Sequence, residues 1–289
     1  MSSPYTWLGR GLLVLVLVVL GFLTWLGKTQ SGLRWALDRL PASIDVVRPQ
    51  GDLSQFSFAR MSIDYEGTSL DLEAGQLRWN AFDLLTKTLR FHQISAQNVT
   101  LSLPADDEPS EPYIPWQGID LPFNVIVEDL QLHNVTIIET LSPALERQLT
   151  EFDRIDLVAT LQGQKLDVSQ LEMNFAPSAT ALQLRSILLR GTVDLGAQKH
   201  GKIRLEQAIN GLNNEQVWSA IGLIQGTWAQ LNIKQRFSGA LTMDIDAMVD
   251  SILGTRPTWS GTLSNDHAFD LHIEQQKITI QKLDISSQG

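Results

Sequence analysis

Apolar residues recur at every second position along most of the chain beyond its first fifty residues. Pairs such as Phe56 and Phe58, or Leu70 and Leu72, are two apart, the spacing that places side chains on one face of a β-strand. Clusters of Gly, Asn, Asp and Ser separate such pairs, as turns require. The pattern predicts a mainly β protein. A few short helices are expected at 81–88, 143–150, 213–221 and 246–253.

One apolar pattern occurs twice, thirty-six residues apart. The first copy consists of Leu89, Phe91, Ile94, Ala96, Val99 and Leu101, and the second of Val125, Val127, Leu130, Leu132, Val135 and Ile137. Both copies contain the tripeptide Asn-Val-Thr, beginning at Asn98 and at Asn134. A fainter third copy consists of Leu161, Gly163, Leu166, Val168, Leu171 and Met173. The regular step predicts stacked supersecondary units rather than a closed globule.

The spacing within the repeat predicts bent strands. Steps of two keep side chains on one face, whereas a step of three, such as Ala96 to Val99, would move them to the other. One extra residue at each such step, a β-bulge, returns the apolar side chains to one face and bends the strand. We therefore expect a long, strongly curved sheet with a single apolar face. The alternative is a sandwich whose strands are buried on both faces.

The N-terminus predicts a membrane anchor. Residues 7–26 read WLGRGLLVLVLVVLGFLTWL, with Arg10 as the only charge, and twenty helical residues span about 30 Å, the thickness of a bilayer's hydrocarbon core. We predict a transmembrane signal-anchor at 7–27 after a cytoplasmic tail at 1–6. A cleaved signal peptide fits less well, because no small-residue cleavage site follows. The expected anchor residues are Trp7, Leu12, Leu15, Val18, Phe22 and Trp25.

Composition shifts divide the rest of the chain. The segment SGLRWALDRL at 31–40 predicts a short amphipathic helix capped by Ser31, which either lies on the membrane or plugs the end of the β core. The expected units are a juxtamembrane helix and linker at 28–52, a first β-groove unit at 53–103, an acidic, proline-rich loop at 104–121, and further β-groove repeats at 122–289. The phrase Gly-x-(Val/Leu) is expected to open strands at Gly191, Gly239 and Gly261. The chain ends where a further strand opened by this phrase is expected, so we expect the chain to be truncated at 289.

Composition also limits the chemistry. The chain has no cysteine, five histidines and a formal net charge of −10. Disulfides, thiolate metal sites and cysteine nucleophiles are therefore excluded, and the acidic balance argues against binding nucleic acid. No histidine pair has the spacing of a helical zinc motif, and the P-loop, G-x-G-x-x-G and G-x-S-x-G phrases do not occur. We expect no catalytic residue, no metal and no cofactor, and hence a protein that is not an enzyme.

Several phrases stand in a distinctive order. TQSGL (29–33) follows the anchor, and PASID (41–45) follows the short helix. The strand, turn and strand of 51–79 come next, then DLLTKTLRFHQISAQNVTLSLP (83–104), an acidic insert and LPFNVIVEDLQLHNVTI (121–137). This order resembles the N-terminal part of the TamB family, the inner-membrane component of the translocation and assembly module within the AsmA-like group.

The resemblance implies a single-pass protein of the cell inner membrane whose body lies in the periplasm. That body would be an elongated, curved β-groove of stacked repeats, taco-like and apolar inside. The groove would carry phospholipid from the inner to the outer membrane in outer-membrane biogenesis. The implied partner is an outer-membrane barrel protein, bound through a C-terminal region absent from this chain. The alternative is a scaffold or chaperone that assists outer-membrane protein (autotransporter) assembly with that partner through an exposed sheet edge. The groove candidates are Leu89, Phe91, Ile94, Ala96, Val99, Leu101, Val125, Val127, Leu130, Leu132, Val135, Ile137, Leu166, Val168, Leu171 and Met173.

Overall fold

The computed structural model describes most of the chain from Trp25 onward. The described residues are 25, 27–65, 67–104, 121–142, 145–177, 182–196, 202–213, 216–250, 258–265, 267–273, 276–281 and 284–288. The anchor predicted at 7–27 lies outside them except for Trp25 and Gly27, as does the loop predicted at 104–121 except for its two end residues. Within these ranges, no helix has the length and apolar character needed to cross a membrane.

The described residues are mainly β, as predicted. The helical elements with defined bounds are α2 (Gln30–Leu37) and the 3₁₀ helix η1 (Ala81–Thr86). The strands are β1 (Ile44–Val47), β2 (Gln50–Asp52), β3 (Gln55–Tyr65), β4 (Thr68–Trp79), β5 (Thr88–Pro104), β6 (Asn124–Ser142), β7 (Leu145–Gln162), β8 (Lys165–Phe175), β9 (Leu182–Asp194), β10 (Lys202–Asn213), β11 (Gln216–Thr227), β12 (Gln230–Gly239), β13 (Asp244–Asp250), β14 (Thr258–Ser264), β15 (Phe269–Ile273), β16 (Gln276–Ile280) and β17 (Asp284–Gln288).

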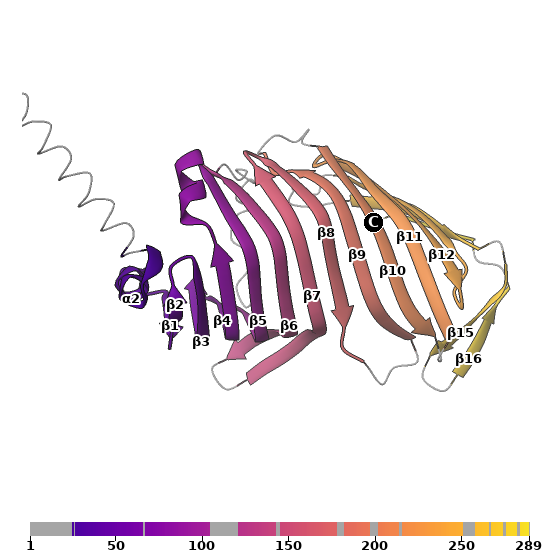
Figure 1. Ribbon diagram of the computed structural model, residues 1–289. Helices are drawn as coiled ribbons and strands as arrows, with labels where there is room; N and C mark the ends of the chain where they lie inside the picture. Colours follow the sequence, from indigo (N-terminus) through magenta and orange to yellow (C-terminus); the bar gives the residue numbers. More distant parts are fainter. Residues whose placement is uncertain are drawn as a thin grey trace, which may run out of the picture.

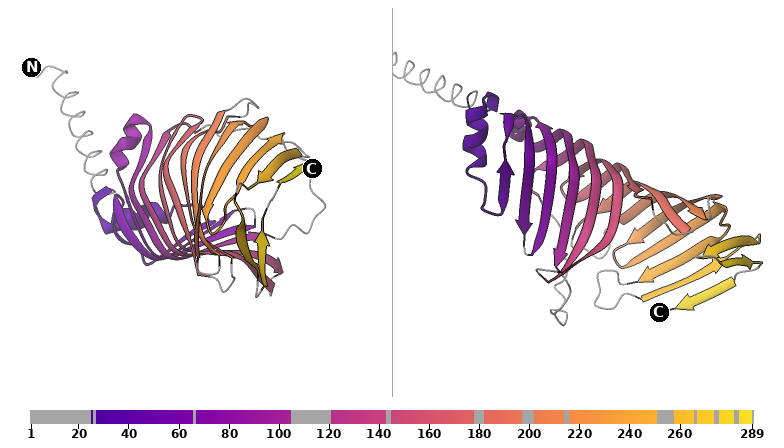
Figure 2. Two further views of the ribbon diagram at one scale, coloured as in Figure 1. Left: turned by 90° about the vertical axis from the view of Figure 1, so that its right-hand side faces the viewer. Right: turned by 90° about the horizontal axis from the view of Figure 1, so that it is seen from below.

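One long sheet dominates the fold (Figure 1). It has 15 strands, in the order β1-β3-β4-β5-β6-β7-β8-β9-β10-β11-β12-β13-β14-β17, with β2 also paired to β3. Neighbouring strands are antiparallel except for β5 and β6, which are parallel. The sheet curls strongly when viewed along its length (Figure 2). The prediction of a single curved sheet is therefore confirmed, and the sandwich alternative is wrong.

The two copies of the thirty-six-residue repeat lie on the parallel strands β5 and β6, and the register of this pair matches each paired residue with the one thirty-six positions later. Leu89 pairs with Val125, and Val99 pairs with Val135, so the two copies lie side by side with every slot matched. The third copy is divided between elements. Its first residue lies in β7, Gly163 lies in the following turn with a φ of 56°, and its last four residues lie on β8.

β-Bulges are present where the repeat predicts them. The register between β4 and β5 shifts at the step that leaves out Asn98. Asn98 and Asn134 both have a φ of 50°, in the left-handed region that asparagine adopts more readily than most residues. The Nδ2 of Asn98 donates to Glu73 Oε2 (3.1 Å), and the Nδ2 of Asn134 donates to Asn98 Oδ1 (3.1 Å). The matching bulges thus form a small ladder across three strands.

Three of the predicted helices are wrong. Residues 145–150 lie in β7, residues 216–221 lie in β11, and residues 246–250 lie in β13. Each stretch is a short apolar segment, and periodicity alone does not separate a short helix from a strand. Each stretch is paired with at least one neighbouring strand of the sheet, an interaction that the local pattern does not contain.

Two local predictions need smaller corrections. Helix α2 is capped by Thr29 rather than Ser31, because the Thr29 Oγ1 accepts a hydrogen bond from the Gly32 N–H (3.0 Å). Gly191 and Gly261 lie inside strands and Gly239 ends one, so this phrase does not open strands. At Gly191, with a φ of 145°, an added Cβ would lie 1.9 Å from the Arg204 carbonyl oxygen. Close backbone approach, not strand initiation, explains this glycine.

The two ends of the sheet carry small covering elements. Leu33 of α2 has no exposed surface and packs with Phe56 and Phe58 of β3, so the helix plugs the first end of the β core. Near the other end, Phe269 of the β15–β16 hairpin packs with Trp218 of β11. Both ends of one sheet face are therefore covered by other parts of the chain.

Candidate lipid-binding face

Strand register determines which side chains share a face, because paired residues on neighbouring strands point the same way. One row of paired residues crosses six strands, from β4 to β9. It consists of Leu77, Ile94, Leu130, Leu157, Leu171 and Leu189. The next row, on β5 to β9, consists of Ala96, Leu132, Ile155, Met173 and Ile187. We call this side of the sheet the apolar face and the opposite side the polar face.

All sixteen groove candidates named from the sequence lie on the apolar face. The candidates on β5 pair with those on β6, and the β6 residues Val125, Val127, Leu130 and Leu132 pair with alternate residues of β7. Alternate residues of a strand share a face, so the bulges do return the stripe to one side. The four candidates on β8 join the same rows through β7.

Burial indicates which face is the inside of the curve, because side chains on the inside of a bent sheet crowd one another and those on the outside are spread apart. We infer that the apolar face is the inside. Among the described residues of β3 to β12, every buried one lies on the apolar face. Ala96 and Val99 are each 2% exposed and form a cluster with Val135 and Phe152. The rings of Phe152 and Phe175 are 4.7 Å apart between centroids.

Sequence reasoning missed β7 and the later strands of this face. Ile155, Leu157, Ala159 and Leu161 alternate on β7, between the second and third copies of the repeat. That period of two was an available signal. Strands β9 to β12 add further apolar-face residues, namely Ile187, Leu189, Ile203, Leu205, Ile209, Ala220, Ile224, Ile233 and Phe237.

The polar face is covered by charged side chains paired across strands. Ser62 Oγ (2.6 Å) and Arg60 donate hydrogen bonds to Asp71 and lower the pKa of its carboxyl, against a partial desolvation that would raise it. Hydrogen bonds from His92 (2.7 Å) and Arg90 (2.6 Å) likewise lower the pKa of Glu128. These groups are solvent-accessible, so this face is a hydrated surface.

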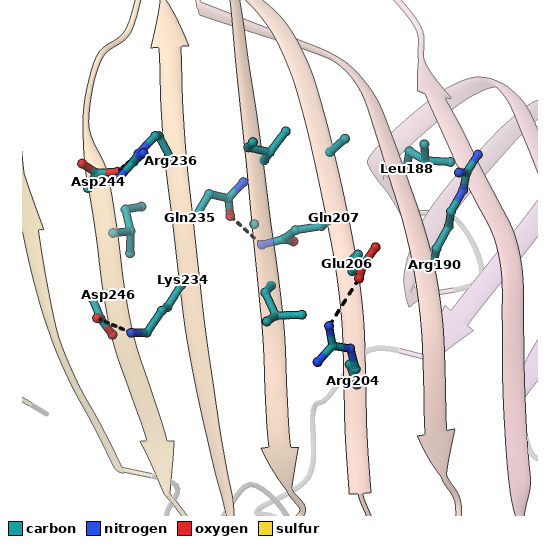
Figure 3. A pocket seen from close by; sticks show the side chains of 15 residues that line it. Leu188, Arg190, Arg204, Glu206, Gln207, Lys234, Gln235, Arg236, Asp244 and Asp246 are labelled. Atoms are coloured by element: carbon teal, nitrogen blue, oxygen red, sulfur yellow. Dashed lines mark hydrogen bonds and ion pairs between the residues drawn. The ribbon is translucent and has the colours of Figure 1, made fainter.

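A shallow hollow of about 850 Å³ lies over β9 to β13 (Figure 3). Polar-face residues make up most of its lining, and residues of the central row, namely Gln207, Gly222, Gln235 and Ile245, complete it. Leu188, Ala208, Ile221 and Leu223 form its apolar part. Its rim consists of the ion pairs Arg204–Glu206 (3.5 Å), Lys234–Asp246 (3.4 Å) and Arg236–Asp244 (2.9 Å). No sequence-predicted site residue lies in this hollow. Within the described ranges, no three acidic or histidine side chains gather closely enough to hold a metal ion.

The fold and the face together define a class of protein: an elongated, curved β-sheet whose apolar face carries rows that are unbroken from β4 to β9. A family model described as TamB, N-terminal domain, matches residues 17–138, which include β1 to β5 and most of β6. The predicted resemblance to the N-terminal part of the TamB family is confirmed over these residues. No curated protein and no solved structure matches the chain.

Proposed function

We propose that this protein is a non-catalytic, inner-membrane-anchored bridge whose apolar face guides phospholipid acyl chains across the periplasm to the outer membrane. The observation that carries the proposal is the continuity of the apolar rows from β4 to β9. The match of residues 17–138 to the TamB N-terminal domain, from an envelope-associated family, supports the location. An outer-membrane barrel protein remains the proposed partner.

The energetics favour such a path. Each methylene that leaves a bilayer for water costs about 0.8 kcal/mol, so a bare acyl chain does not cross an aqueous gap. Six strands spaced about 4.8 Å apart give an apolar row roughly 24 Å long without a polar side chain. A chain lying along this row exchanges one apolar contact for another at each step, and its transfer needs no catalytic group.

The test uses a photocrosslinking residue placed on either side of β6 in the full-length protein. Leu130 and Gln131 are adjacent, and they point to the apolar and the polar face respectively. In envelope membranes we expect the probe at Leu130 to crosslink phospholipid and the probe at Gln131 not to do so. Equal crosslinking from both positions would contradict the proposal.

A charge introduced into the apolar row tests the function. Leu130→Glu places a carboxylate in the apolar row, where desolvation is costly, and we expect lost lipid crosslinking at other apolar-face positions and a leaky outer membrane. Gln131→Glu is the matched control and is expected to behave as wild type. If Leu130→Glu folds and transports normally, the lipid path is not on this face.

The scaffold alternative makes a different prediction. Strand addition uses backbone groups at a sheet edge, so proline substitutions in β1, the first strand of the described sheet, would then impair outer-membrane protein assembly more than Leu130→Glu does. A lipid conduit predicts the reverse order of severity. Measuring both phenotypes for both variants separates the two functions.

A further inference from the structure

The central apolar row is interrupted on three consecutive strands. After Leu189 of β9, its next members are Gln207 on β10, Gly222 on β11 and Gln235 on β12. The row then returns to apolar residues with Ile245 of β13 and Leu263 of β14. Two amides thus lie in the middle of a face whose other central positions are apolar.

The two amides meet across the glycine (Figure 3). The Gln207 Nε2 donates a hydrogen bond of 2.6 Å to the Gln235 Oε1, although one strand separates β10 from β12. Gly222 permits this, because an added Cβ would lie 3.1 Å from the Gln207 Nε2 and 2.5 Å from the Lys234 carbonyl oxygen. The arrangement is a polar bar across the inner surface of the sheet.

The bar leaves one donor unsatisfied. Gln235 is 9% exposed, and its Nε2 is buried without a hydrogen-bond partner in the part of the chain that the structure describes. Burying an amide donor unpaired is unfavourable, and native proteins seldom retain one without a reason. Leucine would fit the apolar character of the row better. The unpaired donor therefore points to an acceptor that is absent here.

The surroundings specify the chemistry of that acceptor. The residues flanking the bar along its strands on the same face are Leu205, Ile209, Ala220, Ile224, Ile233 and Phe237, all apolar. Lys234 and Arg236 belong to the polar face, where they pair with Asp246 and Asp244. A buried phosphate would thus lack a cation on this side, whereas a neutral carbonyl oxygen needs only a hydrogen-bond donor.

We propose that the Gln207–Gln235 bar is a binding station for the ester carbonyl of a glycerolipid, with the Gln235 Nε2 as donor. This inference rests on the proposed function, because it places the lipid's acyl chains on the apolar rows beside the bar. The ester lies where the apolar chains join the polar part of the lipid. A donor at this point holds a lipid at a defined position along an otherwise uniform surface.

The experiment compares two lipids with the same chains and headgroup. Full-length protein in detergent is titrated with a diacyl phosphatidylethanolamine and with its diether analogue, which lacks both carbonyls. One neutral hydrogen bond corresponds to a preference of about two- to tenfold for the diacyl lipid. Gln235→Leu is expected to abolish that preference. Gln225→Leu, the same substitution on the polar face of β11, is expected to retain it.

The outcomes separate this inference from the proposed function. Equal binding of both lipids by wild type, or an unchanged preference in Gln235→Leu, overturns the ester station while lipid binding itself stands. If Gln235→Leu lowers the affinity for both lipids equally, the contact is with the headgroup, and this result also overturns the ester station. Failure of wild type to bind either lipid would refute the proposed function. Gln235→Met replaces the leucine variant if the latter does not fold.

Discussion

The bulge at Asn98 gives a sharp prediction about how the sheet is bent. Asn98 has a φ of 50° and donates to Glu73 while accepting from Asn134. Asn98→Val places a β-branched residue in the left-handed region, at a cost of about 1–3 kcal/mol. Loss of the side-chain hydrogen bonds adds about 1 kcal/mol. We expect the free energy of unfolding to fall by about 2–4 kcal/mol in total.

Two companion variants separate these contributions. Asn98→Gly loses the same hydrogen bonds but adopts a positive φ without strain, so its stability should fall by only about 1 kcal/mol. The second companion variant is Thr100→Val. Thr100 lies two residues further along β5, on the same face and in extended backbone. Valine is well suited to that position, and we expect a change within about 0.5 kcal/mol.

The assay is urea unfolding of the full-length protein in detergent, followed by the fluorescence of its eight tryptophans. The three free energies should rank Thr100→Val above Asn98→Gly, and Asn98→Gly above Asn98→Val. If the valine and glycine variants at Asn98 are equally stable, the left-handed backbone does not bear the cost. The bulge would then not be what bends β5.

Two further predictions concern the two faces. Val135 is 5% exposed, and Val135→Ala, which removes two buried methyl groups, should lower the free energy of unfolding by about 2–3 kcal/mol. Thr136→Ala on the polar face should change it by less than about 0.5 kcal/mol. Urea unfolding midpoints measure both variants, and equal losses would contradict a core on one face only. The pKa values of Asp71 and Glu128 are lowered in the folded protein. Their contribution to the free energy of unfolding is therefore present in full above the ordinary carboxyl pKa, and it is lost as the pH falls through the lowered pKa of the folded state. Unfolding midpoints should therefore drop on acidification and drop less in Asp71→Asn, and parallel pH profiles would refute this.

The sequence by itself determined the fold class and the one-sided character of the early strands. The slots from Leu89 to Leu101 fix which residues share a face, because side-chain alternation is a local property of the backbone. The three-residue steps likewise predict bulges, and Asn98 and Asn134 mark two of them. The order of phrases was enough to indicate TamB.

Only the tertiary structure decided how the strands are paired. The described residues of the helices predicted at 143–150, 213–221 and 246–253 lie in strands, because their backbones pair with neighbouring strands that the local pattern does not identify. The same applies to the bar, since Gln207 and Gln235 lie twenty-eight residues apart and meet only when β10, β11 and β12 are in register. Alternation places a side chain on a face, but register decides which side chain it meets there.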